Sequence, residues 1–230
     1  MRGWLSWAAA AAIGVSAGAA TMMLIDRHDG GGVRTYLLAH PDVIPEAMQR
    51  LRDRETGKTI AAGRAAIETP VGSAWAGNPR GDVTLVEYYD YNCGYCRASL
   101  PTVAALVKSD PGLRVVYREL PILAPSSHDA ALASLAAAHQ GRFAAFHDAL
   151  YAAGQVSKAS IAAVARQTGV AASATAVPAD EAAITANMKA AGELGMTGTP
   201  SWVIGDRVMI GAQTLEQLQD AVATARHPGS

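Results

Sequence analysis

The spacing of hydrophobic residues predicts an alternation of strands and helices over most of the chain. Short runs rich in β-branched and aromatic residues are typical of buried strands, and four runs have this character: 83–89, 113–119, 201–204 and 207–210. The first run is apolar on both faces, as expected in the middle of a mostly parallel sheet. The last two flank Gly205-Asp206, a turn sequence that predicts a hairpin.

Apolar residues three or four positions apart indicate amphipathic helices between these runs. A helix is predicted over 96–108, where Pro101 is expected to introduce a kink, and another over 213–226. Four more are predicted between the second and third strands, over 129–139, 143–152, 159–168 and 181–191. The order is therefore strand, helix, strand, a block of helices, two strands and a helix, and its first three elements predict a right-handed crossover.

The N-terminus has a different pattern, because residues 4–25 carry no charge. Arg2 precedes this run and charged residues follow it, an arrangement that keeps the positive end in the cytoplasm. The run is long enough to cross a bilayer, which needs about 20 helical residues. We interpret residues 1–29 as a signal peptide or an uncleaved membrane anchor, either of which places the rest of the chain outside the cytoplasm. The alternative is a buried, alanine-rich helix of the folded domain.

Residues 30–68 are interpreted as a helical extension that precedes the main domain. The extension begins with three glycines, which form a flexible hinge, and continues as a charged helix over 46–66 with expected interruptions at Gly57 and Gly63. Residues separated by seven, four and three positions form one apolar stripe: Leu37, Ile44, Met48 and Leu51. Such a stripe must be covered, either by the chain's own domain or by another copy, so residues 33–66 are a candidate segment for a homo-oligomer.

Composition limits the classes of protein that remain. Half of the residues are apolar, 17% are charged and the net charge is −1, so the chain can bury a large core. The lack of a basic excess argues against a nucleic-acid partner. The length fits one domain of about 150 residues with additional segments, and we place that domain at 69–227.

The chain has only two cysteines, Cys93 and Cys96, shortly after the 83–89 strand. A strand followed by Cys-x-x-Cys at the start of a helix is the sequence form of a redox-active dithiol. A four-cysteine zinc site is excluded, since no second pair exists. A structural disulfide and a copper(I) site made of two thiolates are the alternatives. The dithiol reaction itself requires no cofactor and no metal.

Three residues are candidates for catalysis. Cys93 would be the nucleophile, because the N-terminus of a helix favours a thiolate, and Cys96 one turn later would resolve the mixed disulfide. Glu87 interrupts the apolar strand six residues before Cys93. A carboxylate buried there without partners would change its pKa and relay a proton to or from Cys96. The alternative is a glutamate at the strand end that reaches solvent.

Four tyrosines near the dithiol, Tyr88, Tyr89, Tyr91 and Tyr95, have two interpretations. They form an apolar collar for unfolded substrates, or Tyr88 and Tyr89 belong to the core. The histidines offer no comparable signal, since none is adjacent to the dithiol in the sequence.

The element order, the Cys93-Gly94-Tyr95-Cys96 motif and Thr197-Gly198-Thr199-Pro200 before the hairpin resemble the thioredoxin fold with an inserted helical domain. Among α/β proteins of this fold, the chain resembles the DsbA family, the extracytoplasmic thiol-disulfide oxidoreductases of bacteria. The similarity covers roughly residues 70–225. It implies a helical insertion at about 125–194, in a domain that follows the helical extension and the signal or anchor segment.

The resemblance assigns further roles. It implies a cis peptide bond before Pro200, and it places Thr199 beside the dithiol, where its backbone receives a substrate strand and its hydroxyl lies near Cys93. Gly94 and Tyr95 are expected to contribute to the same substrate-binding surface. The implied partners are extracytoplasmic proteins with cysteines or disulfides and a membrane redox protein. The implied location is the periplasm, with the protein soluble after signal cleavage or tethered to the inner membrane.

Finer features are similar to particular branches of the superfamily. Gly94-Tyr95 between the cysteines and Thr199 before Pro200 are similar to the DsbC and DsbG disulfide isomerases, and the N-terminal extension is similar to ScsC-type and Com1-type proteins. DsbA itself has a histidine between its cysteines that stabilises the thiolate, and this chain lacks it. We therefore expect an isomerase or reductase. A dithiol oxidase, or a copper-binding or redox-sensing module, is the alternative.

Overall fold

The computed structural model describes residues 32–171 and 178–227. The expected signal peptide or anchor at 1–29 therefore lies outside the described residues. In the described ranges, no helix combines the length and the hydropathy that crossing a bilayer requires. By its internal contacts the chain divides into two units, Met1–Arg52 and Asp53–Ser230.

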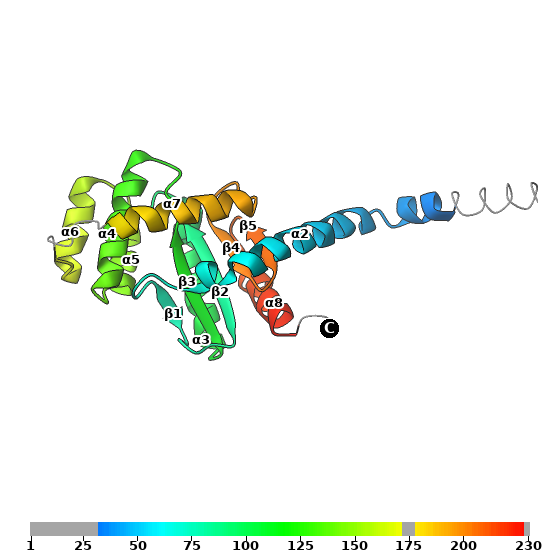
Figure 1. The fold of residues 1–230 in the computed structure, drawn as a ribbon, viewed down its shortest axis with the longest axis horizontal. Coiled ribbons are helices and arrows are strands. Elements are labelled where there is room, and N and C mark those ends of the chain that lie inside the picture. The colour runs from blue at the N-terminus through cyan, green and yellow to red at the C-terminus, as the bar shows by residue number, and fades with distance from the viewer. Residues whose placement is uncertain (1–31, 172–177, 228–230) are drawn as a thin grey trace, which may run out of the picture. The chain divides into compact units, whose positions relative to one another are not determined.

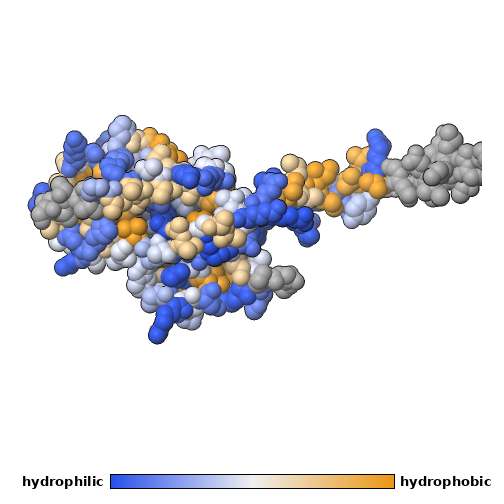
Figure 2. All heavy atoms as spheres, in the orientation of Figure 1, coloured by the Kyte–Doolittle hydropathy of each residue, from blue (hydrophilic) through white to orange (hydrophobic). Residues whose placement is uncertain are grey.

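The described part of the first unit is helical and exposes apolar side chains. Residues 32–39 form a helix, and α2 (Val43–Glu68) begins in this unit and continues into the second. Ile44, Met48 and Leu51 leave 50%, 55% and 54% of their surface exposed. Figure 2 shows hydrophobic residues gathered along this segment.

The predicted interruptions of α2 at Gly57 and Gly63 are wrong, because the helix runs through both residues. Gly57 is buried, and a Cβ atom at this position would lie 3.1 Å from the Cβ of Asp206. Close packing between the helix and the hairpin therefore outweighs the low helix propensity of glycine, which amounts to about 1 kcal/mol.

The second unit is built on one five-stranded mixed sheet in the order β1-β3-β2-β4-β5. The strands are β1 (Trp75–Gly77), β2 (Val83–Tyr89), β3 (Leu113–Glu119), β4 (Ser201–Ile204) and β5 (Arg207–Ile210). The four predicted strands are confirmed, but the expectation of a mostly parallel sheet is wrong. Only β2 and β3 are parallel, while the other three pairs are antiparallel. A helical crossover joins β2 to β3, whereas the β4–β5 hairpin must be antiparallel.

Helices cover both faces of the sheet (Figure 1). Successive side chains of β2 point to opposite faces of the sheet, and all seven residues of this strand are buried. Val86 and Tyr88 pack against α2 and α7 on one face, and Leu85 packs against α3 and α8 on the other. The helices after α2 are α3 (Gly94–Ser109), α4 (Pro125–His139), α5 (Phe143–Ala152), α6 (Lys158–Thr168), α7 (Pro178–Glu193) and α8 (Leu215–Arg226).

The helical insertion lies between β3 and β4 and consists of α4 to α7, as predicted. Its α4 and α5 share a buried cluster with the residues that follow β2, including both cysteines. Pro101 lies inside α3. The insertion therefore supplies one wall around the start of α3.

A buried arginine on β3 fixes the C-terminal end of α2. The Arg118 guanidinium donates to the carbonyls of Ile67 at 3.1 Å and Thr69 at 2.5 Å, and also to that of Ala66. Helix ends leave carbonyls without intrahelical partners, and Arg118 satisfies two of these acceptors together with the carbonyl of Thr69 just after the helix. Burial lowers the pKa of this guanidinium. The last turns of α2 are thus an integral part of the second unit.

Candidate active site: the Cys93–Cys96 dithiol

Cys93 occupies the N-cap of α3. Its backbone is extended, with φ −81° and ψ 115°, and its sulfur accepts a hydrogen bond from the Cys96 backbone N–H at 3.4 Å. The unpaired N–H groups and the positive end of the helix dipole favour an anionic sulfur here. The predicted placement of Cys93 at a helix N-terminus is confirmed.

Both cysteines are free thiols, and both are buried. Cys93 is 5% exposed and Cys96 1% exposed, whereas Tyr95 between them is 70% exposed. Gly94 is exposed as well. The solvent side of the motif is therefore formed by Gly94 and Tyr95.

The Thr199–Pro200 peptide bond is cis, and Thr199 lies against the dithiol. The Cys93 thiol donates to the Thr199 carbonyl at 3.1 Å. The Thr199 hydroxyl is buried and has no hydrogen-bond partner within the described residues. The hydrogen bond with Cys93 is made by the Thr199 carbonyl, and the hydroxyl takes no part in it.

Glu87 is buried in the middle of the sheet, so the alternative of a glutamate that reaches solvent is wrong. It is 3% exposed, and burial raises its pKa to about 8. Its Oε2 atom has no hydrogen-bond partner in the part of the chain that the structure describes. Burial, and then the charge of Glu87, raise the pKa of Cys96. The charge on Glu87 therefore influences the ionisation of Cys96.

The interpretation of the tyrosines as a collar is wrong for three of them. Tyr88, Tyr89 and Tyr91 are at most 1% exposed, and only Tyr95 faces solvent. Tyr88 and Tyr89 point to opposite faces of β2, each of which is covered by helices. Because helices cover both faces of this strand, Tyr88 and Tyr89 belong to the hydrophobic core.

A buried polar network that the sequence did not indicate lies on the same face as Glu87. Tyr89 donates to the Glu119 carboxylate, and Tyr91 donates to Ser134 at 2.8 Å and lies 3.1 Å from His147. Burial raises the pKa of Glu119 to about 8 and lowers that of His147 to about 3, so the imidazole is neutral. Glu119 lies opposite Tyr89 in the β2–β3 pairing. In the sequence, the alternation of residues along the strand is the one signal that its side chain belongs to this network.

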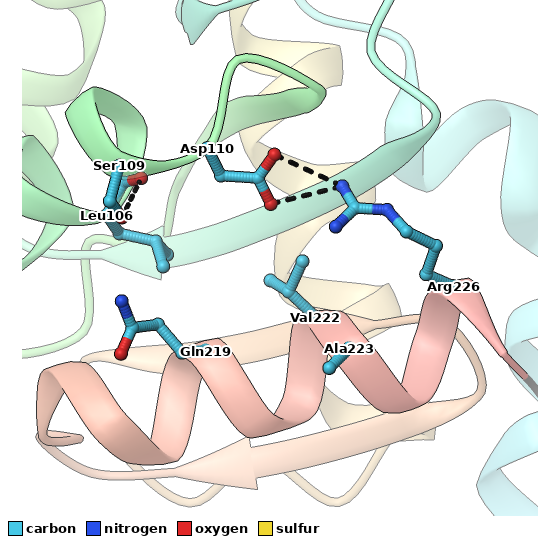
Figure 3. A pocket seen from close by; sticks show the side chains of 7 residues that line it. All are labelled: Leu106, Ser109, Asp110, Gln219, Val222, Ala223 and Arg226. Carbon is cyan, nitrogen blue, oxygen red and sulfur yellow. Dashed lines mark hydrogen bonds and ion pairs between the residues drawn. The ribbon is translucent and has the colours of Figure 1, made fainter. Parts of the chain in front are cut away.

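In the described ranges, no cluster of three or more histidine, cysteine, aspartate or glutamate residues has the arrangement of a metal site. A hollow of about 370 Å³ does lie between α3 and α8, where Arg226 bonds Asp110 (Figure 3). This hollow is at the far end of α3. Leu106 on its wall is about 18 Å along the helix from Gly94, so the hollow is separate from the dithiol.

Comparison with protein families decides the classification. The model described as the DSBA-like thioredoxin domain matches residues 84–223. The chain belongs to this DsbA-like thioredoxin family. A second model, described as the copper resistance protein ScsC N-terminal domain, matches residues 30–56 of this DsbA-like chain.

Solved structures are similar over most of the DsbA-like chain. A thioredoxin-like oxidoreductase from Silicibacter pomeroyi is 43% identical, with a TM-score of 0.63 over 66% of this chain and 91% of that one. A linker-deletion mutant of Proteus mirabilis ScsC is 26% identical, with a TM-score of 0.71 over 84% and 90%. The thiol-disulfide exchange protein alpha-DsbA2 from Wolbachia pipientis is 26% identical, with a TM-score of 0.68 over 75% and 97%.

The curated relatives are much longer proteins. The chain is 43% identical over 72 residues to Na(+)/H(+) antiporter NhaA 3 of Salinispora tropica, and 31% identical over 150 residues to NhaA 1 of Salinispora arenicola. These matches cover 30% and 62% of this chain but only 11% and 23% of the antiporters.

Proposed function

We propose that this protein is a thiol-disulfide oxidoreductase acting on other proteins through Cys93 and Cys96. One observation carries the proposal. The free thiol of Cys93 combines a helix N-cap position with a 3.1 Å contact to the carbonyl that precedes the cis proline. The DsbA-like family and the thiol-disulfide exchange protein among the similar structures support the same chemistry.

In the reductive direction, the Cys93 thiolate attacks one sulfur of a substrate disulfide. A mixed disulfide forms, and the second substrate sulfur leaves as a thiolate. Cys96 then loses its proton and attacks the Cys93 sulfur, which releases the first substrate sulfur. The protein dithiol is oxidised to a disulfide and the substrate disulfide is reduced to two thiols. The oxidative direction is the same sequence in reverse.

Glu87 is proposed to accept the proton of Cys96 in the second step. Burial keeps that thiol protonated, so it needs a base before it can attack. A carboxyl with a pKa of about 8 takes up and releases protons close to neutral pH. In the reverse direction Cys96 leaves as a thiolate, and the protonated carboxyl of Glu87 returns the proton to it.

Thr199, Pro200, Gly94 and Tyr95 are proposed to bind the substrate beside Cys93. The exposed ring of Tyr95 offers an apolar contact to an unfolded chain. The backbone of Thr199 is close enough to Cys93 for a bound strand to present its sulfur there. The substrates we infer are extracytoplasmic proteins with cysteines or disulfides.

We favour isomerase or reductase activity over oxidase activity. Gly94 and Tyr95 replace the residue pair that contains a thiolate-stabilising histidine in DsbA, and Thr199 is similar to its counterpart in the isomerases. An isomerase also gains from presenting several dithiols in one assembly. The exposed residues Ile44, Met48 and Leu51 offer a surface for self-association.

The charge-free run at 4–25 supports a periplasmic location, either soluble after cleavage or tethered to the inner membrane. An oxidising compartment allows the dithiol to cycle. A membrane redox protein would then restore its working oxidation state.

Copper(I) binding is the second candidate, and it rests on the description of the ScsC N-terminal model. That match covers residues 30–56 and includes neither cysteine. The dithiol reaction therefore remains the first proposal.

Trapping of the mixed disulfide tests the proposed function. Purified Cys96→Ala should accumulate a covalent complex with a disulfide-bonded peptide, because the resolving thiol is missing. Cys93→Ala should form none, since the remaining thiol is 1% exposed. Ser99→Ala, a buried position on α3 that carries no redox group, is the control and should turn over like the parent. A complex formed equally by Cys93→Ala would contradict the assignment of the nucleophile.

A further inference from the structure

The side chain of Asp90, three residues before Cys93, accepts four hydrogen bonds. It is 1% exposed. Its Oδ1 accepts from the Asn92 backbone N–H at 2.8 Å and the Ser127 hydroxyl at 2.7 Å. Its Oδ2 accepts from the backbone N–H groups of Ile122 and Leu123, each at 2.9 Å. All four partners donate, so each carboxylate oxygen receives two hydrogen bonds.

The backbone of Asp90 adds two contacts at the same point. Its carbonyl accepts from the Cys93 N–H at 3.0 Å and from the Tyr151 hydroxyl at 3.1 Å. Asp90 therefore binds the N-cap residue of α3 directly. Through Tyr151 it also connects that residue to α5 of the insertion.

The segments that Asp90 joins are distant in the sequence but surround the cysteines. They are the loop from β2 to α3, the residues between β3 and α4, and the first turn of α4. Asn92 strengthens the connection, because its side-chain amide donates to Ser126 at 3.0 Å and to Ser127 at 2.9 Å. One main-chain bond, from the Leu120 N–H to the Tyr89 carbonyl at 2.8 Å, joins the ends of β2 and β3, and the side chains of Asp90 and Asn92 extend this connection toward Cys93.

We propose that Asp90 is a positioning residue of the dithiol, which holds Cys93 at the N-cap so that the Cys96 N–H and the Thr199 carbonyl both reach its sulfur. The inference rests on the proposed function and adds a residue to it. Only a carboxylate can meet this environment, since an ionised Asp is acceptor-only and offers about four lone-pair sites. An amide of the same shape would turn its NH₂ group toward the two backbone N–H groups at Oδ2, or toward the Asn92 N–H and the Ser127 hydroxyl at Oδ1, so at least one backbone N–H would face a donor.

Asp90→Asn is the direct test, measured as the equilibrium constant of the Cys93–Cys96 disulfide with glutathione. The N-cap hydrogen bond stabilises the reduced, thiolate form. A displaced Cys93 loses this stabilisation, so the equilibrium should shift about tenfold toward the disulfide, which corresponds to about 30 mV. The rate of Cys93 alkylation by iodoacetamide at pH 7 should fall in parallel. A purely structural role would lower the unfolding temperature and leave both quantities unchanged.

Asp110→Asn is the matched control. Asp110 lies at the other end of α3, where it accepts from the Gly112 N–H at 2.9 Å and from Arg226 at 3.1 Å. This change should lower stability while the glutathione equilibrium stays within twofold of the parent. Ser127→Ala removes a single donor to Asp90 and should give a smaller shift in the same direction as Asp90→Asn. If Asp90→Asn does not fold, the Ser127→Ala variant tests whether Asp90 positions Cys93.

Three outcomes would overturn the inference. A folded Asp90→Asn protein with an equilibrium within twofold of the parent would do so, and so would a shift of equal size in Asp110→Asn. If Asp90→Asn does not fold, a glutathione equilibrium of Ser127→Ala that equals that of the parent would also overturn the inference. In each case the parent still exchanges with glutathione and the proposed function stands. A parent dithiol that does not exchange at all would overturn both.

Discussion

The Cys93 thiol donates a hydrogen bond to the Thr199 carbonyl at 3.1 Å, although 106 residues separate the two in the sequence. The sheet register explains the contact. β2 and β4 are antiparallel neighbours in which Tyr88 faces Ser201, so the residues after β2 meet the residues before β4. The whole helical insertion lies between these two points of the chain, yet the sheet brings them together.

Replacing Glu87 with Gln should stabilise the protein increasingly as the pH rises from 5 to 7. The folded-state pKa of about 8 lies above the ordinary value of 4.5. The unfolded chain therefore ionises first, and the parent loses stability as the pH rises between these values. Gln does not titrate, so its advantage should grow by about 2 kcal/mol between pH 5 and pH 7. Urea unfolding at both pH values measures this difference.

Glu216→Gln is the control for this experiment, because it removes an exposed carboxylate from the first turn of α8. Its difference from the parent should show no gain of the size expected for Glu87→Gln. A constant difference for Glu87→Gln would mean that Glu87 is not held protonated by burial.

The same substitution should slow the second chemical step. Without a proton acceptor, Cys96 attacks the mixed disulfide more slowly, and general-base contributions commonly reach about 10²-fold or more. Attack by Cys93 should change little, since Glu87 acts on Cys96. Rapid-quench experiments with a peptide disulfide separate the two steps. Equal slowing of both would indicate a general loss of structure.

Arg118→Met should loosen the end of α2 from the sheet. Three carbonyls would lose their donor, and a buried unsatisfied group costs about 1–3 kcal/mol, offset in part by removal of a buried charge. We expect a net loss of about 2 kcal/mol and faster hydrogen exchange across residues 60–69. Arg114→Met on the same strand removes only bonds to the Thr84 hydroxyl and is the control. Unchanged exchange in Arg118→Met would contradict the anchoring role.

Substituting the exposed stripe should alter self-association. Ile44→Asp with Met48→Asp adds two negative charges to the apolar side of α2, and sedimentation velocity should show loss of any oligomer. Arg50→Asp changes the net charge by the same amount and lies away from the stripe by helical spacing. A parent that sediments as a monomer at all concentrations would contradict the self-association proposal.

The strands and the dithiol were predictable because local rules determine them. β2 and β3 are compact apolar runs, and Cys93 directly precedes a helical pattern. The cis bond at Pro200 followed only from the resemblance. Glu87 could be recognised because it breaks an apolar strand.

The buried polar contacts were not predictable in the same way. Asp90, Glu119 and Arg118 look like ordinary polar residues in the sequence, and their roles depend on partners from distant segments. Gly57 shows the same limit, since its place inside a continuous helix depends on how closely the hairpin approaches. Strand direction likewise depends on how the insertion returns the chain to the sheet.

Recovery of activity by a scrambled multi-disulfide enzyme tests the central claim, that Cys93 exchanges disulfides in other proteins. Point variants are preferable to a truncation at Thr69, which would remove the buried residues Ile60 and Ile67. The parent should restore activity and Cys93→Ala should not, while Ile44→Asp with Met48→Asp should exchange disulfides but unscramble poorly. Equal recovery with the parent and with Cys93→Ala would contradict the account.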